Sequence, residues 1–245
     1  MTFATRQDVL DIQNEMPWAQ RDLPKTVYQM LRDTAHAFPD RPAVSYQIMS
    51  GPTDKAETMS WKQFHDEVCQ AANLFRSLKI KETDVVALIM PNSLETAVAT
   101  IGAMVAGIAN PINPLLEPEQ IGAILRETDA KVVVTLKAFP KTDIAQKCAE
   151  AVRHAPRVHT VLEVDLNRYL PPPKSWIVPL IRPKNPNNHH ADLKSFNAEL
   201  GKQSTSLTFE DSGEDRVGAY FHTGGTTGMP KVAQHKYSGM IYNGW

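Results

Sequence analysis

Residues 220–231 read YFHTGGTTGMPK and form the most specific pattern in the chain. The stretch combines three glycines, three hydroxyl side chains and one cation, namely Thr223, Gly224, Gly225, Thr226, Thr227, Gly228 and Lys231. Glycine lets the backbone approach a ligand closely and adopt positive φ. Successive backbone N–H groups in such a turn form a concavity for an anion, and the lysine adds a mobile positive charge. The stretch therefore predicts a strand followed by a loop that holds phosphate groups.

The spacing of this loop differs from that of the Walker A motif, the general phosphate-binding template. Walker A places Ser or Thr directly after a Gly-Lys pair, whereas Met229 and Pro230 precede Lys231 here and Val232 follows it. A Walker-type nucleotide site is therefore not indicated. An ordinary glycine-rich surface turn stays open as the alternative to a phosphate site.

The spacing Thr-Gly-Gly-Thr-Thr-Gly-x-Pro-Lys instead resembles the phosphate-binding signature of the AMP-forming adenylating enzymes, which include acyl-CoA synthetases, nonribosomal peptide adenylation domains and luciferases. That family usually has Ser at position 224 and Gly-Val at positions 232 and 233, where this chain has Gly224 and Val232-Ala233. The sequence around His222, followed by Ala233-Gln234-His235, is most similar to that of acyl-CoA synthetases. Agreement over twelve consecutive positions favours this resemblance over a plain surface turn.

The resemblance implies a chemistry and a role for each matching residue. In the family, a carboxylate attacks the α-phosphate of ATP, pyrophosphate leaves, and the acyl-adenylate then forms a thioester with CoA. Residues 223–228 would hold the β- and γ-phosphates through backbone donors and threonine hydroxyls. Lys231, the one catalytic candidate, would add positive charge there. Mg²⁺ would also help to stabilise the charge of the leaving pyrophosphate. The implied small molecules are ATP, a carboxylic acid and CoA.

Composition bounds the rest of the interpretation. A chain of 245 residues with 42% hydrophobic residues can form one large or two small domains with a sizeable core. Lys and Arg total 26 against 27 Asp and Glu, so no basic excess points to nucleic acid. Cys69 and Cys148 lack metal-binding spacing, which fits a reducing cytoplasm and predicts neither zinc nor a disulfide framework.

Helical and strand patterns alternate along the chain. Helices are expected at residues 26–38, 61–78, 94–105, from Pro118 onward, and 141–153, and strands at 43–48, 85–90, 108–112, 132–134 and 158–164. Ser60 and Gln63 have the spacing of a capping box, and Ser93 or Asn92 is the expected cap of the helix that follows. Short, uniformly apolar strands between amphipathic helices predict an α/β fold with a parallel sheet and helices on both faces. The resemblance implies the same organisation, and residues 92–95, Gly107 and residues 111–114 follow the family's order.

Three parts are predicted within one partial adenylating domain over residues 1–245. Residues 26–165 form an α/β subdomain, residues 166–210 a proline-rich irregular insertion, and residues 216–245 a strand, the phosphate loop and the beginning of a helix. Apolar residues 176–178, 180 and 181 are flanked by Lys174, Arg182 and Lys184 within the insertion. Contact of residues 174–184 with a membrane surface or lipid-like substrate is one hypothesis, and packing onto the chain's own domain is the alternative.

Other patterns carry less chemistry. Residues 1–25 have no apolar stretch typical of a signal peptide, and the longest apolar run, 97–109, is too short to cross a bilayer, which predicts a buried helix. His189-His190 has no acidic or cysteine partner at ligand spacing, so no metal site is assigned. His222 is expected either to shape the phosphate loop or to pack at the strand end. Markers of serine hydrolases, zinc proteases and Rossmann dehydrogenases are missing.

Family members continue for several hundred residues beyond the phosphate loop, whereas this sequence ends at Trp245. We therefore expect the N-terminal portion of an acyl-CoA synthetase, inactive alone and prone to self-association through exposed apolar surface. The alternative is a noncatalytic phosphate-binding or scaffold module. Continuation into Tyr-Gly-x-Thr-Glu and Thr-Gly-Asp segments would favour the enzyme. The acid, expected to be fatty or otherwise hydrophobic, is not specified by these residues.

Overall fold

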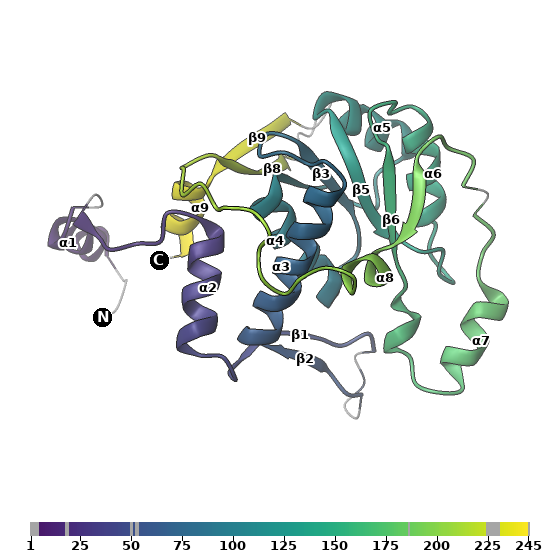
Figure 1. Cartoon of the computed structure of the whole chain (residues 1–245), viewed down its shortest axis with the longest axis horizontal. Coiled ribbons are helices and arrows are strands. Elements are labelled where there is room, and N and C mark those ends of the chain that lie inside the picture. Colours follow the sequence, from purple (N-terminus) through teal and green to yellow (C-terminus); the bar gives the residue numbers. More distant parts are fainter. Residues whose placement is uncertain are drawn as a thin grey trace.

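A single seven-stranded sheet organises the computed structural model, which describes residues 5–17, 20–49, 51, 54–185, 187–223 and 231–244. The strand order is β7-β6-β5-β3-β4-β8-β9, and helices cover both faces (Figure 1). The members are β3 (Val85–Ile89), β4 (Ile108–Pro111), β5 (Ala130–Leu136), β6 (Thr160–Val164), β7 (Asp192–Ser195), β8 (Val217–Thr223) and β9 (Lys231–Lys236). All neighbours are parallel except β8 and β9, which are antiparallel. The predicted α/β class is confirmed.

The central strands carry apolar side chains on both faces, because helices cover each face of the sheet. Every residue of β3 is buried, as are six of the seven in β5. Helices α3 (Trp61–Ser77) and α4 (Leu94–Ala106) pack against each other, and α5 (Pro118–Glu127) and α6 (Ile144–Arg153) form the second pair. Right-handed crossovers from β3 to β4 and from β4 back to β5 place these two pairs on opposite faces.

The predicted helix starts are confirmed by their caps. Thr26 caps α2 (Val27–Ala37), and Ser60 and Gln63 form the expected capping box of α3. Of the two candidates before α4, Ser93 accepts the hydrogen bond from the Thr96 amide. These side chains satisfy backbone donors that a helix start leaves unpaired.

The apolar run 97–109 is not one helix, because it divides at Gly107 into α4 and β4. The Gly107 amide still donates to the Ala103 carbonyl, 2.8 Å away. A Cβ at Gly107 would stand 2.5 Å from the Asp84 carbonyl oxygen, closer than packed atoms allow. The chain passes too near the preceding loop for any side chain there, and the strand begins at the next residue.

The segment 166–210 is more regular than its prolines predicted. It contains a 3₁₀ turn η2 (Leu166–Tyr169), α7 (Lys174–Ile181), β7 and α8 (Phe196–Leu200). Pro173 stands just before α7, where a missing N–H costs nothing. Pro179 lies inside α7 and has no N–H to donate to the Ser175 carbonyl one turn back. The side-chain Nδ2 of Asn167 donates to that carbonyl instead, at 3.0 Å. The helix survives because a side chain replaces the lost backbone donor.

Three further elements were not expected. The first is β2 (Glu57–Ser60), which pairs antiparallel with the expected strand β1 (Pro42–Tyr46), and the second is β9, which precedes α9 (Tyr237–Gly244). Helix α1 (Arg6–Glu15) buries none of its residues and projects from the body (Figure 1). No helix in the described part of the chain combines the length and apolar character needed to cross a bilayer.

Candidate functional site

The two ends of the predicted phosphate loop are neighbours on adjacent strands. Thr223 is the last residue of β8, Lys231 is the first of β9, and the two are paired in register. Residues 224–230 lie outside the described residues, so Gly224, Gly225, Thr226, Thr227 and Gly228 are not placed. The strand pairing nevertheless brings the two ends of the predicted loop, positions 223 and 231, to the same point of the sheet.

That point lies at the carboxyl edge of the parallel strands. Strand β8 runs parallel to β4, with Ala219 opposite Ala109, so Thr223 emerges at the same edge as the residues after Pro111. Adjacent strands β3 and β4 are followed by helices on opposite faces of the sheet. In open α/β sheets, such a switch in direction leaves a crevice beyond the carboxyl ends, where ligands bind. The topology therefore places Thr223 and Lys231, the residues that flank the loop, beside the expected ligand crevice.

A chain of buried and half-buried polar groups supports the end of β8. His222 Nε2 lies 2.7 Å from Asn110 Oδ1 on β4, and Asn110 Nδ2 donates to Thr128 Oγ1 at 3.1 Å. The Thr128 hydroxyl donates in turn to the Ile124 carbonyl at 2.8 Å. Since that hydroxyl has a single proton, it can only accept from Asn110, which turns Asn110 Oδ1 towards His222. His222 Nε2 therefore carries the proton and donates it.

The same geometry favours a neutral His222. Burial lowers the pKa of this imidazole, and the carboxylate of Glu127 only partly opposes the shift. With Nε2 as donor, Nδ1 is left as an acceptor, and it has no hydrogen-bond partner within the described ranges. The structure shows His222 packed at the strand end, where it fixes that end against β4. The other expected role, shaping the phosphate loop, falls on residues outside the described ranges.

The other end of β8 is fixed by Arg216, just before the strand. Its guanidinium donates to the carbonyls of Met104 at 2.8 Å, Val105 at 3.0 Å and Gly107 at 2.6 Å. These carbonyls belong to the end of α4, where helical acceptors lack partners and the dipole favours a cation. The Tyr237 hydroxyl also donates to Met104, at 2.6 Å. The β8–β9 unit is thereby attached at both ends to α4 and β4.

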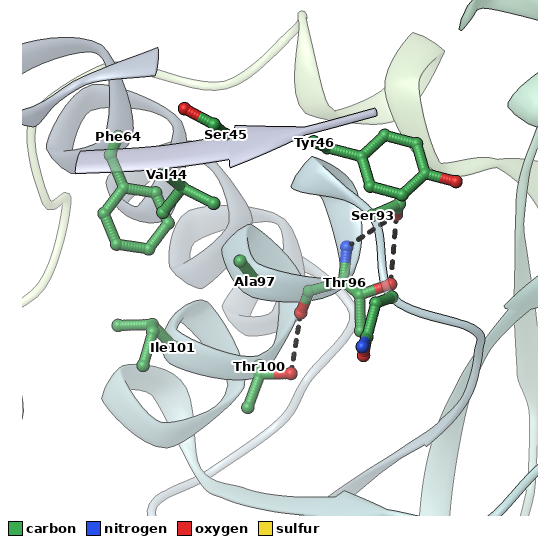
Figure 2. A pocket seen from close by; sticks show the side chains of 10 residues that line it. Val44, Ser45, Tyr46, Phe64, Ser93, Thr96, Ala97, Thr100 and Ile101 are labelled. Carbon is green, nitrogen blue, oxygen red and sulfur yellow. Dashed lines mark hydrogen bonds between the residues drawn. The ribbon is translucent and has the colours of Figure 1, made fainter. Parts of the chain in front are cut away.

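A cleft of about 480 Å³ opens between β1 and α4, next to the carboxyl end of β3 (Figure 2). Its walls are mainly apolar, with a few hydroxyls, and comprise Val44, Ser45, Tyr46, Phe64, Asn92, Ser93, Thr96, Ala97, Thr100 and Ile101. Ser93 and Thr96 bond to each other at 3.0 Å. The lining holds no carboxylate or cation, so we assign it neither phosphate binding nor acid–base chemistry.

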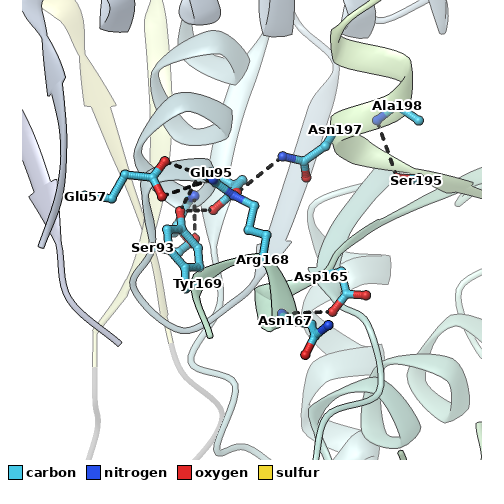
Figure 3. A network of polar contacts seen from close by, with 11 residues as sticks. Glu57, Ser93, Glu95, Asp165, Asn167, Arg168, Tyr169, Ser195, Asn197 and Ala198 are labelled. Atoms are coloured by element: carbon cyan, nitrogen blue, oxygen red, sulfur yellow. Dashed lines mark hydrogen bonds and ion pairs between the residues drawn. The ribbon is translucent and has the colours of Figure 1, made fainter. Parts of the chain in front are cut away.

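A network of charges ties the segment 166–197 to the body of the molecule (Figure 3). Glu95, only 3% exposed in the first turn of α4, accepts from Arg168 Nε at 2.5 Å and from the Tyr169 hydroxyl at 2.7 Å. Asn197 approaches the same carboxylate at 3.3 Å, and Arg168 also donates to Glu57 at 2.8 Å. Burial alone would raise the pKa of Glu95, but the bonds from Tyr169 and Arg168 outweigh it and hold that pKa below its usual value. The network is structural, since it links β2, α4, η2 and α8, and none of its charged side chains lines the cleft.

Metal ligands do not gather among the residues with described positions, where no three His, Cys, Asp or Glu side chains cluster. His189 is partly buried, and burial lowers its pKa. Burial also raises the pKa of the Cys69 thiol to about 11 and that of the Cys148 thiol to about 12, which makes both poor nucleophiles at neutral pH.

Comparison with known proteins decides the family. The model of a family described as AMP-binding enzyme matches residues 31–245. The chain belongs to this family. A marinolic acid–CoA ligase of Pseudoalteromonas sp. (strain SANK 73390) is 32% identical over 239 residues, which cover 97% of this chain and 34% of the relative. A long-chain-fatty-acid–CoA ligase of Bacillus subtilis (strain 168) is 28% identical, covering 95% of this chain and 40% of that protein.

Solved structures of the adenylate-forming type have the same fold. An anthranilate CoA ligase in complex with anthranoyl-AMP superposes with a TM-score of 0.67 at 19% identity, covering 91% of this chain and 36% of that one. A benzoate CoA ligase from Burkholderia xenovorans LB400 gives a TM-score of 0.63 at 15% identity, with 89% and 36% covered. The chain thus spans about a third of the length of the proteins it matches.

Several supporting residues escaped the sequence analysis. Asn110 interrupts an otherwise apolar strand, and a polar residue at a predicted buried position was the available signal. Arg216 gave no comparable signal, and Glu95 stood out only as part of the family-like stretch 92–95, because charged residues near helix and strand ends are common. Their partners lie far away in the sequence, so only the fold identifies them.

Proposed function

We propose that the chain is the nucleotide-phosphate-binding part of an ATP-dependent acyl-CoA synthetase. The observation that carries the proposal is the pairing of Thr223 with Lys231 at the carboxyl edge of the sheet, around a loop with the family's phosphate signature. The full-length protein would join a carboxylic acid to CoA through an acyl-adenylate. Hydroxide is a poor leaving group, and adenylation replaces it with AMP.

Each residue of the loop has a proposed role in the first half-reaction. Backbone N–H groups of Gly224, Gly225 and Gly228 and the hydroxyls of Thr223, Thr226 and Thr227 would hold the β- and γ-phosphates. Lys231 would stabilise charge as pyrophosphate leaves. Mg²⁺, when bound, would neutralise phosphate charge. His222 and Asn110 would hold the first residue of the loop in place, because they join its strand to β4 at 2.7 Å.

A hydrophobic acid is the proposed substrate class. Relatives named for long-chain fatty acids and marinolic acid match 95% and 97% of this chain. Relatives named acetyl-coenzyme A synthetase also match, over 76% of it. The decisive experiment is a pyrophosphate-release assay on the full-length protein with acetate, octanoate, palmitate and benzoate. We expect release with octanoate or palmitate to exceed that with acetate at least tenfold. Acetate as the best acid would contradict the substrate class, and no release with any acid would contradict the ligase proposal.

The 245 residues alone are proposed to be inactive, since they supply only the phosphate side of the reaction. ATP–pyrophosphate exchange by the purified chain should not exceed the background of a reaction without protein. Measurable exchange would overturn this. The alternative, a noncatalytic phosphate-binding or scaffold module, would be favoured if the full-length protein bound ATP but released no pyrophosphate with any acid.

A further inference from the structure

We propose that α7 is a membrane-contact helix that binds the surface of anionic lipid bilayers. Its outward face carries Trp176, Ile177, Leu180 and Ile181, which are 69%, 47%, 85% and 59% exposed. In a helix of 3.6 residues per turn, these four side chains fall within an arc of about 140°. Large apolar side chains are normally exposed singly, and a contiguous group marks an interaction surface.

The inward face of α7 is already satisfied, so the helix has a fixed orientation. Val178 is buried, and Arg182 directly after the helix donates to the Ala138 carbonyl at 2.6 Å and to Asp165 at 2.9 Å. Asn167 holds the Ser175 carbonyl at the other end. The chain's own domain therefore accounts for one side of the helix only. Packing onto the chain's own domain, the alternative, accounts for Val178 but not for the four exposed side chains.

Charge around the helix favours an anionic surface as the occupant. The only Lys, Arg, Asp or Glu side chains between Leu166 and Ala191 are Arg168, Lys174, Arg182 and Lys184, all positive, although the whole chain has a formal charge of −1. Lys174, the first residue of α7, and Lys184, three residues after the helix ends, are both exposed. Basic residues at the ends of an apolar helical face, with a tryptophan on it, are the features of helices that lie in a lipid interface.

The same charges disfavour a second copy of the chain. A two-fold symmetric contact brings equivalent surfaces together, so the lysines at the ends of one α7 would meet those of the other without opposing carboxylates from this segment. A bilayer with acidic headgroups pairs with the lysines and buries the four apolar side chains at the same time.

The contact is independent of the phosphate site. Helix α7 lies in the connection between β6 and the edge strand β7, whereas β8 and β9 form the opposite edge of the sheet (Figure 1). Substitutions on α7 therefore leave the strands around Thr223 and Lys231 intact, and a test with vesicles requires no ligase activity.

The test is flotation of the 245-residue chain with vesicles of phosphatidylcholine alone or with one third phosphatidylglycerol. We expect binding to the anionic vesicles that weakens with salt. Leu180→Asp should reduce it at least tenfold, whereas Leu115→Asp, a matched control at a residue 78% exposed in the turn before α5, should not. Lys174→Glu with Lys184→Glu should weaken binding by more than about fivefold for each lysine, since removal alone costs about that much. These two surface changes leave the packed side of α7 untouched and keep the test valid if Leu180→Asp fails to fold.

A spectroscopic readout locates the contact. Tryptophan fluorescence should shift to shorter wavelength on adding anionic vesicles, and Trp176→Phe should remove the shift while leaving most of the binding. Absence of binding to anionic vesicles would overturn the proposal. Equal binding by wild type and the double lysine variant would do the same. The face would instead belong to a contact with a second copy if two results coincide. The chain would not bind vesicles, and Leu180→Asp would lower its sedimentation coefficient in the absence of lipid.

Discussion

At the scale of single residues, the site depends on how buried polar atoms are paired. Asn110 is fully buried, and its amide has one donor and one acceptor engaged, by Thr128 and His222. An unpaired buried polar atom costs more than a formed hydrogen bond gains. The contact between β4 and the end of β8 is therefore specific, because only a donor at position 222 satisfies Asn110 Oδ1.

Replacing His222 tests this pairing. His222→Phe should lower the free energy of unfolding by about 1–3 kcal/mol, because Asn110 Oδ1 loses its donor. His222→Gln, which keeps an N–H donor on a shorter side chain, should cost about 1 kcal/mol less. Urea denaturation followed by circular dichroism measures both. Equal losses for the two variants would show that the hydrogen bond does not contribute.

The pH dependence of stability provides a second test of the same residue. The pKa of His222 is lowered in the folded chain, so the unfolded chain takes up a proton first as the pH falls past about 6.5. The stabilisation from neutral His222 is therefore complete above that pH and declines below it. The stability difference between wild type and His222→Gln should shrink from pH 7.5 to 5.5. A constant difference would contradict a neutral, buried imidazole.

At the scale of elements, caps and apolar periodicity predicted most helices and central strands, since these signals are local. Thr26, Ser60 and Pro118 each begin a helix where the sequence placed one. The elements that were missed depend on partners outside the element itself. Helix α7 depends on Asn167 bonding the carbonyl that Pro179 cannot reach, and β9 depends on pairing with β8. Neither pairing leaves a periodic or capping signal in the residues of the element itself.

The ion pair between Glu95 and Arg168 should contribute to stability by holding η2 against α4. Glu95→Gln should cost about 1–3 kcal/mol, because the charge that Arg168 and Tyr169 bond is lost. Glu57→Gln removes the exposed partner of the same arginine and should cost under about 1 kcal/mol. The measurement is again urea denaturation, and similar costs for both would contradict the ranking by burial.

Acid should abolish the difference between wild type and Glu95→Gln. The folded pKa of Glu95 is below its unfolded value near 4.5, so its stabilisation is present above that pH and is lost as the pH falls through the folded pKa. The cost of the substitution should therefore decline as the pH falls from 7 through 4. A cost that grows in acid would show that the carboxyl is already protonated at neutral pH.

At the scale of the whole molecule, the sheet brings together residues that are more than a hundred positions apart. Arg216 contacts the end of α4, and His222 contacts β4. The fold class and the place of the loop after a strand followed from sequence, because the phosphate signature and the apolar strands are local patterns. The supporting contacts of Asn110 and Arg216 did not follow, because they exist only once β8 lies beside β4.

Arg216→Met should loosen the β8–β9 unit from the rest of the sheet. Several charge-assisted bonds to backbone carbonyls are lost at once, so we expect a cost of about 3 kcal/mol. Arg32→Met, at an exposed arginine paired with its neighbour Asp33, should change stability by less than about 0.5 kcal/mol. Hydrogen exchange should show faster exchange in β9 than in β5 for Arg216→Met. Uniform protection in both strands would indicate that other contacts hold the unit.

The most direct test of the phosphate loop compares two lysines on one strand. Lys231 opens β9 beside Thr223, whereas Lys236 closes the strand beside Val217, and both are exposed. In the full-length protein, Lys231→Ala should slow ATP–pyrophosphate exchange by about 10–1000-fold, and Lys236→Ala should leave it unchanged. Equal exchange rates for wild type and Lys231→Ala would contradict the assignment of this loop to the phosphates of ATP.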